Sequence, residues 1–154
     1  MRMTESCQTI VLVEDDIHHA MLIEIFIKDS GCGFPIHHFL TGEDVLTHLI
    51  PKGNAREKAA ALQAIQNTSL IILDLKLSGI PGTEVLEALK GDVRTKHIPV
   101  MVLSTSSHPK DLEFCYGHGV NAYLVKPGQF EQFQDTIQKA VHFWTQINVL
   151  PNSR

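Results

Sequence analysis

The sequence predicts an α/β fold: a doubly wound, five-stranded parallel sheet with helices on both faces. Strand-like and helix-like segments alternate along the chain, which is typical of parallel strands joined by crossover helices. Several of the strand-like segments are short apolar runs, as expected when both faces of a strand are buried. Polar or charged residues that could take part in chemistry follow several of these runs. The clearest case is the run Leu70–Leu73, which ends at Asp74.

In the first third of the chain the predicted order is strand, helix, strand, helix. Residues 9–13 form an apolar run, and Asp16 fits the N-cap position of a helix over 17–30. Apolar residues recur at helical spacing within that helix. A second strand is expected over 36–40, and residues 41–44 have the Thr-Gly-Glu-Asp sequence typical of a helix start.

Residues 51–69 form the least regular part of the sequence. A proline and a glycine interrupt the pattern, and residues 55–66 are rich in helix formers. We therefore expect a surface excursion with one or two helical turns. The strand that ends at Asp74 comes next, and a loop rich in glycine and proline leads to a third helix over 83–90.

The last third of the chain continues the alternation. A strand over 98–103 precedes a helix that begins near Pro109 and ends at Gly117 or two residues later. A short strand over 122–125 and a last helix over 129–147 follow. The prediction is thus five strands and five helices.

Two adjacent aromatic residues, Phe143 and Trp144, lie near the end of the last predicted helix. Neighbouring helical residues point in directions about 100° apart, so both rings cannot face the same core well. One of the two is a candidate for a partner surface, and packing between helices is an equal alternative.

Composition and charge indicate a single globular domain. Of the 154 residues, 44% are hydrophobic and 19% charged, so one sizeable core over 8–147 is expected. A net charge of −4 gives no electrostatic reason for nucleic-acid binding, and no apolar stretch approaches the length of about 20 residues that spans a bilayer. Three widely spaced cysteines indicate free thiols in a reducing cytoplasm. We expect one domain over 1–154 with no output domain, located in the cytoplasm and bound to neither nucleic acid nor membrane.

Five side chains with complementary chemistry follow the first, third, fourth and fifth predicted strands. They are Glu14, Asp15, Asp74, Ser104 and Lys126. Because the carboxyl ends of parallel strands meet at one edge of a sheet, we expect these side chains to gather there. Three carboxylates repel one another unless a divalent cation lies among them, and Mg²⁺ is suited to such an oxygen site. A carboxylate can also attack phosphorus and form an aspartyl-phosphate, while a lysine and a hydroxyl bind the phosphoryl oxygens.

Four motifs resemble those of the receiver domain of the two-component response-regulator family, which has a flavodoxin-like fold. The motifs are Val13-Glu14-Asp15-Asp16, Leu73-Asp74-Leu75, Pro99 with Ser104 five residues later, and Tyr123-Leu124-Val125-Lys126-Pro127. The resemblance implies that Asp74 is the phosphoacceptor and that Ser104 and Lys126 contact the phosphoryl group. It implies that Glu14, Asp15, Asp74 and the backbone carbonyl of Lys76 hold Mg²⁺. It also implies that Tyr123 is an aromatic switch, which turns inward when Ser104 moves toward the phosphate.

Two further segments resemble those of the single-domain regulators that partner phytochrome histidine kinases. They are the long segment before Asp74 and the ending Phe143-Trp144-Thr145-Gln146-Ile147-Asn148-Val149-Leu150-Pro151. This resemblance implies a sensor histidine kinase as partner, a phytochrome among such kinases, and the absence of an output domain. It also implies a homodimer formed through the fourth helix, the fifth strand and the last helix.

The sequence departs from the family pattern at two places. Ser78-Gly79-Ile80-Pro81-Gly82 replaces the usual proline and Asp-Gly pair after the phosphoacceptor, and Ser104 stands where threonine is common. Both changes are compatible with phosphorylation, but they leave the phosphoryl lifetime and the loop geometry open.

Two other functions compete with the phosphorylation switch. A phosphatase of the haloacid-dehalogenase type also uses an aspartyl nucleophile, but it needs a second aspartate two residues later, where this chain has Lys76. A receiver-like scaffold that docks without phosphorylation is the other alternative, and the complete set of polar strand-end residues argues against it. We expect a protein that catalyses its own phosphorylation and hydrolysis rather than an enzyme with external substrates.

The nine histidines provide no evident metal site. His18-His19 and His37-His38 are adjacent pairs, and adjacent residues point to different faces of a strand or helix. No two histidines are four residues apart, the spacing that would place both on one helix face as metal ligands. We therefore interpret these residues as solvated or partly packed.

Overall fold

The computed structural model describes residues 8–151 and has one parallel sheet of five strands in the order β2-β1-β3-β4-β5. The strands are β1 (Thr9–Val13), β2 (Ile36–Phe39), β3 (Thr68–Leu73), β4 (Val100–Ser104) and β5 (Ala122–Val125). The chain builds outward from β1 to β2 and then crosses to β3 on the other side. A sheet wound in both directions in this way leaves a crevice at the carboxyl ends of β1 and β3. The predicted fold class is confirmed.

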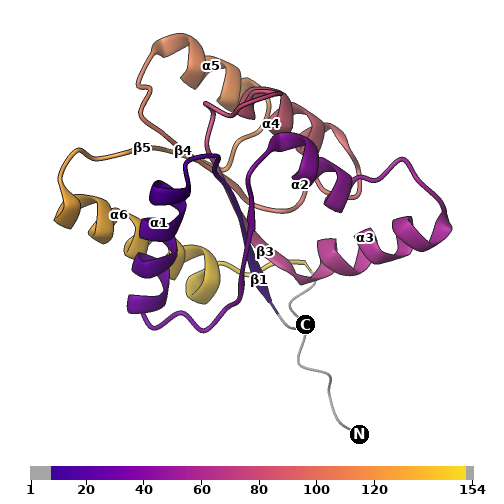
Figure 1. Cartoon of the computed structure of the whole chain (residues 1–154), viewed down its shortest axis with the longest axis horizontal. Coiled ribbons are helices and arrows are strands. Elements are labelled where there is room, and N and C mark those ends of the chain that lie inside the picture. The colour runs from indigo at the N-terminus through magenta and orange to yellow at the C-terminus, as the bar shows by residue number, and fades with distance from the viewer. Residues whose placement is uncertain (1–7, 152–154) are drawn as a thin grey trace, which may run out of the picture.

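Helices cover both faces of the sheet (Figure 1). α1 (Ile17–Asp29) and α6 (Phe130–His142) lie together on one face. The other face carries α2 (Gly42–Leu49), α4 (Gly82–Gly91) and α5 (Pro109–Gly117), with α3 (Ala55–Asn67) beside α2. Within the described part of the chain, no helix has the length and apolar character needed to cross a bilayer.

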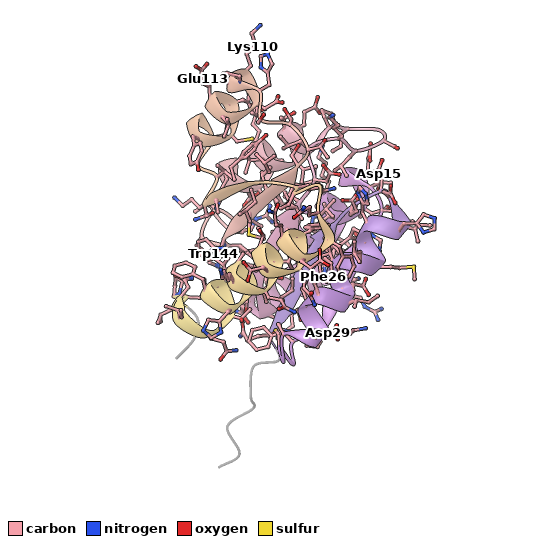
Figure 2. All side chains as sticks on the ribbon, turned by 90° about the vertical axis from the view of Figure 1, so that its left-hand side faces the viewer. Asp15, Phe26, Asp29, Lys110, Glu113 and Trp144 are labelled. Atoms are coloured by element: carbon pink, nitrogen blue, oxygen red, sulfur yellow. The ribbon has the colours of Figure 1, made fainter. Side chains whose placement is uncertain are left out.

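The core has two parts because strand side chains alternate between the two faces. In β1, Ile10 and Leu12 pack toward α1 and α6, while Val11 and Val13 pack toward α2 and α4. Phe26 of α1 anchors the first part, with its ring edge-to-face against Phe130 and Phe133 at centroid distances of 5.1 and 5.4 Å. Figure 2 shows Phe26 between these two helices.

The segment 51–69 differs from the prediction. Instead of one or two helical turns, it forms the 13-residue helix α3, which makes six helices in all before the π-helical turn near the end of the described chain. The Asn54 side chain caps α3 by accepting a hydrogen bond from the Glu57 backbone N–H at 3.0 Å. Only Ala61 and Ile65 are buried among its residues. A helix with so narrow an apolar stripe gives a weak periodic signal, which explains the missed length.

The last helix also differs from a regular helix over 129–147. α6 ends at His142, and Phe143–Ile147 continue as a π-helix. The two aromatic rings contact each other edge-to-face at a centroid distance of 4.9 Å, but their burial differs: Phe143 is 45% exposed, while Trp144 packs against the core cluster beneath α1 and α6. The prediction that the two rings do not share one core direction is confirmed, whereas a partner surface at Phe143 stays a prediction.

Candidate functional site at the carboxyl edge of the sheet

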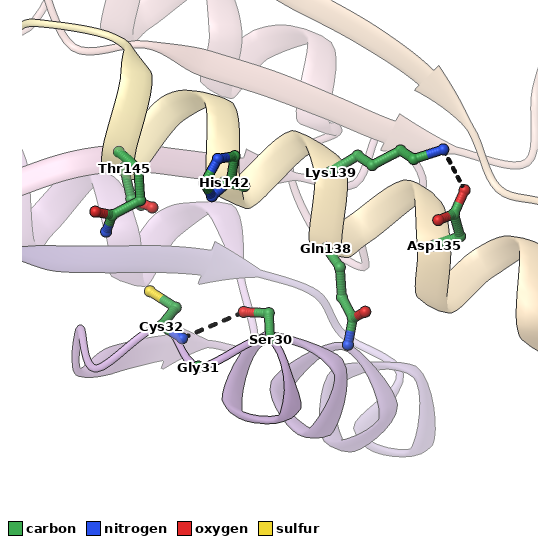
Figure 3. Close-up of a pocket in the computed structure, with 9 residues that line it drawn as sticks. Ser30, Gly31, Cys32, Asp135, Gln138, Lys139, His142 and Thr145 are labelled. Carbon is green, nitrogen blue, oxygen red and sulfur yellow. Dashed lines mark hydrogen bonds and ion pairs between the residues drawn. The ribbon is translucent and has the colours of Figure 1, made fainter.

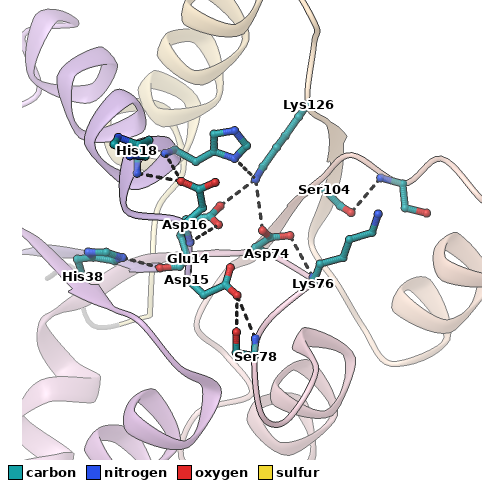
Figure 4. Close-up of polar contacts among 12 residues, drawn as sticks. Glu14, Asp15, Asp16, His18, His38, Asp74, Lys76, Ser78, Ser104 and Lys126 are labelled. Carbon is teal, nitrogen blue, oxygen red and sulfur yellow. Dashed lines mark hydrogen bonds and ion pairs between the residues drawn. The ribbon is translucent and has the colours of Figure 1, made fainter.

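The fold brings three acidic side chains together at the crevice between β1 and β3. Glu14 and Asp15 directly follow β1 and Asp74 directly follows β3, and the last residues of these neighbouring strands are paired in register. One carboxylate oxygen from each of the three lies within 4.8 Å of the others. Glu14 and Asp74 are buried, and Asp15 is partly exposed. Figure 4 shows the three carboxylates converging from the two strand ends.

Lys126 completes the charge balance of this cluster. It follows β5, and its ammonium Nζ lies 2.8 Å from Glu14 Oε2 and 3.3 Å from Asp74 Oδ2. The lysine side chain is only 6% exposed, so these ion pairs are shielded from water. One cation faces three carboxylates, which leaves the cluster with an excess of negative charge.

The charged form of the Glu14 carboxyl is disfavoured in this cluster, mainly by burial. Burial raises its pKa from 4.5 to about 7, although the hydrogen bond from Lys126 acts in the opposite direction. The negative charge of Asp74 raises the pKa further. A divalent cation among the carboxylates would relieve this electrostatic cost, and carboxylate oxygens are the ligands that Mg²⁺ prefers.

The loop after Asp74 fixes the other two carboxylate groups. Asp15 Oδ2 accepts hydrogen bonds from the Ser78 backbone N–H at 3.1 Å and from the Ser78 hydroxyl at 2.9 Å. Asp74 Oδ1 accepts one from the Lys76 backbone N–H at 3.2 Å. The part of Lys76 that contacts the cluster is thus its amide, and metal binding by its backbone carbonyl stays a prediction.

Gly82, the first residue of α4, allows the backbone of Asp74 to sit against that helix. Its N–H donates to the Leu75 carbonyl at 2.9 Å. A Cβ at this position would overlap the Asp74 carbonyl oxygen and lie 2.6 Å from Leu75 Cα. Because both contacts are with backbone atoms, no side-chain movement could make room. The glycine therefore helps to set the position of the Asp74 carboxylate.

Ser104 and Tyr123 are linked through Ser106. Ser104 is fully buried at the end of β4, and its Oγ accepts a hydrogen bond from the Ser106 backbone N–H at 3.1 Å. The Tyr123 hydroxyl donates to the Ser106 carbonyl at 2.8 Å. Burial raises the pKa of Tyr123, so its hydroxyl stays protonated and can donate at neutral pH. A movement of Ser104 would thus change the surroundings of Tyr123 through their shared hydrogen-bond partner, Ser106.

All five strand-end side chains predicted from the sequence therefore lie at one edge of the sheet, but some of their contacts were not predicted. Besides Ser78 and Ser106, two histidines reach this region: the His38 ring Nε2 lies 2.7 Å from the Glu14 carbonyl, and His19 Nδ1 lies 3.3 Å from Lys126 Nζ. No spacing rule in the sequence connects these residues to the cluster.

A second cavity, of about 610 Å³, opens at the other end of α1, between that end and α6 (Figure 3). It is lined by polar groups that include Gln138 and Lys139, and by Cys32. None of the predicted site residues lies there. Cys32 and Cys115 are free thiols, as predicted for cysteines of this spacing, and Cys7 lies outside the described residues.

Comparison with known families agrees with this geometry. The family model of the response regulator receiver domain matches residues 10–138. The chain belongs to the response regulator receiver family. The predicted resemblance is confirmed, and the match assigns the chain to receivers rather than to phosphatases of the haloacid-dehalogenase type.

Several receivers resemble the chain over most of its length. The probable methanogenesis regulatory protein FilR2 of Methanothrix harundinacea is 34% identical, and the match covers 92% of this chain and 86% of the length of FilR2. The response regulator Rcp1 of Synechocystis is 29% identical over 94% of this chain and 93% of its own. A crystal structure of the phosphorylated cyanobacterial phytochrome response regulator RcpA superposes with a TM-score of 0.82, at 32% identity over 94% of this chain and 98% of that one. The Mn²⁺-bound structure of Rcp1 has a TM-score of 0.81, at 29% identity over 94% of this chain and 99% of that one.

Proposed function

We propose that this receiver accepts a phosphoryl group on Asp74 from a sensor histidine kinase and acts as a Mg²⁺-dependent signalling switch. The observation that carries the proposal is the grouping of Glu14, Asp15 and Asp74 within 4.8 Å, with the Lys126 ammonium against two of them. A buried carboxylate beside a cation and a metal-binding group can attack phosphorus.

The residues present fit a magnesium ion. Glu14, Asp15 and Asp74 offer oxygen ligands at the mouth of the crevice, and the backbone carbonyl of Lys76 would add another. Bound there, Mg²⁺ would neutralise the charge of the transferring phosphoryl group. The structure of the related Rcp1 is a Mn²⁺-bound form, which supports metal binding by this chain as well.

In the transfer step, a carboxylate oxygen of Asp74 attacks phosphorus from the side opposite the donor. The new O–P bond forms as the P–N bond of a phosphohistidine breaks, and its electron pair leaves with the imidazole, which takes up a proton. Lys126 then exchanges part of its bonding to Asp74 for a phosphoryl oxygen. Ser104 turns its hydroxyl from the Ser106 amide toward another phosphoryl oxygen. Hydrolysis reverses the state when water attacks phosphorus and breaks the O–P bond.

The switch would reach the surface through Ser106 and Tyr123. The fourth helix, fifth strand and last helix named in the sequence prediction correspond to α5, β5 and α6, because α3 is an additional helix. Exposed apolar side chains support this surface as the place where two copies meet: Tyr116 on α5, Val125 on β5, and Phe143 and Ile147 after α6. Phosphorylation would then alter dimerisation or partner binding.

The kinase partner that we propose is of the phytochrome type. The likeness to RcpA and Rcp1, which extends over nearly the whole chain, supports this pairing. We further propose that residues 1–154 act as a single receiver domain in the cytoplasm and that signalling proceeds through protein contacts. The net charge of −4 supports a protein partner over nucleic acid.

Intact mass spectrometry tests this function. The protein would be incubated with acetyl phosphate with and without Mg²⁺, in parallel with Asp74→Ala. We expect a Mg²⁺-dependent gain of one phosphoryl group that the variant lacks. No gain under any condition would contradict the proposal and favour the phosphorylation-independent docking scaffold.

A further inference from the structure

His19 lies in the first turn of α1, and its ring contacts Lys126. Its backbone N–H donates to Asp16 Oδ1 at 3.1 Å, so the helix cap fixes the start of this turn. Its ring is partly buried, and Nδ1 lies 3.3 Å from Lys126 Nζ. The proposed transfer mechanism assigns no role to this residue.

We propose that His19 is a positioning residue, whose Nδ1 accepts a hydrogen bond from Lys126 and holds the ammonium where a phosphoryl oxygen arrives. The inference rests on the proposed phosphorylation of Asp74. An ammonium group has three N–H donors and no acceptor, so the ring nitrogen facing it must carry the lone pair. The three donors of Lys126 match the three acceptors found: Glu14 Oε2, Asp74 Oδ2 and His19 Nδ1.

The three acceptors of Lys126 differ in whether they could also bind a metal ion. Glu14 and Asp74 are carboxylates that could also hold a metal ion. A bound metal ion would therefore compete with Lys126 for their oxygen atoms. His19 lies outside the acidic cluster and is free of that competition. The hydrogen bond from Lys126 to His19 therefore keeps the ammonium in place when a metal ion weakens the ion pairs of Lys126 with Glu14 and Asp74.

The surroundings of His19 strengthen this bond. The ring and Lys126 both line a cavity of about 390 Å³ whose other walls include Leu22, Phe130 and Phe133. In such apolar surroundings a hydrogen bond to a charged group is stronger than in water. Removal of the ring would open Lys126 to this cavity and allow the ammonium to shift toward Glu14, its nearer carboxylate.

The test compares three substitutions by the rate of phosphorylation with acetyl phosphate at saturating Mg²⁺. His19→Leu removes the acceptor and is expected to slow the reaction about ten- to a hundredfold, as for loss of one hydrogen bond to a charged group. His19→Asn places an amide oxygen near the position of Nδ1 and should restore most of the rate. His18→Leu is the matched control, because His18 is the exposed neighbour and its hydrogen bond to the Asp16 side chain is made by its backbone N–H. Its rate should equal that of the wild type.

A second readout is independent of phosphorylation. In the metal-free wild type, ¹⁵N NMR of the His19 ring should show an unprotonated Nδ1 and a protonated Nε2, and Lys126→Met should shift the Nδ1 signal. A wild-type rate for His19→Leu, failure of His19→Asn to restore the rate, or a protonated Nδ1 would overturn the inference. If the wild type gains no phosphoryl group, the proposed function fails instead, and the NMR signature still decides whether the bond to Lys126 exists. If His19→Leu does not fold, His19→Asn and the NMR signature carry the test.

Discussion

At the scale of single residues, the site depends on an imbalance of charge. Glu14, Asp15 and Asp74 contribute three carboxylates, and Lys126 contributes one ammonium. The sheet fixes the carboxyl ends of β1 and β3, so the folded state holds these like charges close together despite their repulsion. The imbalance favours a divalent cation, and the burial of Glu14 gives the metal-free protein a distinctive dependence of stability on pH.

That dependence can be predicted from Glu14. Its pKa is raised from 4.5 to about 7, mainly by burial, so the folded state binds a proton that the unfolded state releases between these values. Its contribution to stability is therefore fully present below about pH 4.5 and is lost as the pH rises through about 7. We expect the free energy of unfolding of the wild type to fall by about 1 to 3 kcal/mol over this range relative to Glu14→Gln. Urea denaturation in a chelating buffer measures the difference, and pH curves that run parallel for the two proteins would contradict it.

Gly82 provides a second prediction at this scale. Gly82→Ala places a methyl group against the backbone of Asp74 and Leu75, so the start of α4 has to move away from the site. We expect a loss of stability of about 2 kcal/mol or more, and slower phosphorylation of the fraction that folds. Gly91→Ala is the matched control at the other end of the same helix, because a Cβ there meets no atom within 4 Å. The control should be neutral or slightly stabilising in thermal denaturation. Equal effects of the two substitutions would refute the role of Gly82.

At the scale of elements, α3 is an integral part of the core on its face of the sheet. Ile65 is 4% exposed and belongs to the core cluster beneath α2 and α4, whereas Leu62 of the same helix is 49% exposed. The helix therefore contributes to stability through a short apolar stripe and its Asn54 cap.

The corresponding prediction compares these two residues. Ile65→Ala should lower the free energy of unfolding by about 2 to 4 kcal/mol, because it leaves a cavity in the core. Leu62→Ala removes a solvent-exposed side chain and should change it by less than about 0.5 kcal/mol. Chemical denaturation distinguishes the two outcomes. A small effect of Ile65→Ala would mean that α3 is only loosely attached.

The elements also show where prediction from sequence succeeds. The three central strands β1, β3 and β4 could be predicted because they are mostly apolar runs buried on both faces, as in β3, where all six residues are buried. The edge strands β2 and β5 are partly exposed, and their prediction depended on the alternation of strands and helices along the chain. The length of α3 could not, because two buried residues in 13 give almost no periodicity. The π-helical turn that begins at Phe143 could not be predicted either, because nothing in the local sequence distinguishes it from the end of α6.

The same contrast holds for the site. The strand-end residues could be placed together because topology alone brings them to one edge. The partners supplied by loops and helices, such as Ser78 for Asp15 and His19 for Lys126, depend on how the chain turns after each strand. That geometry follows from tertiary packing, which no short motif encodes.

At the scale of the whole molecule, the proposed signal runs from the crevice to α5, β5 and α6. Tyr116 on α5 is 58% exposed and tests this surface without touching the site. In a symmetric dimer Tyr116→Glu introduces two like charges into one interface, so we expect the dissociation constant to rise about tenfold or more. Ile25→Glu, on the exposed side of α1, is a matched control that should leave it unchanged. Light scattering after size-exclusion chromatography, with and without beryllofluoride, measures both variants, and equal dissociation of the two would exclude the proposed surface.

The central claim is that Asp74, among three neighbouring acids, carries the phosphoryl group. Borohydride reduces an acyl phosphate to an alcohol, so treatment of the phosphorylated protein converts the modified residue alone into a stable marker. Tandem mass spectrometry of the resulting peptides locates that marker. We predict homoserine at position 74 in samples that contained Mg²⁺, and unmodified Glu14 and Asp15 in the same samples. A marker at position 14 or 15, or none at position 74, would contradict the account.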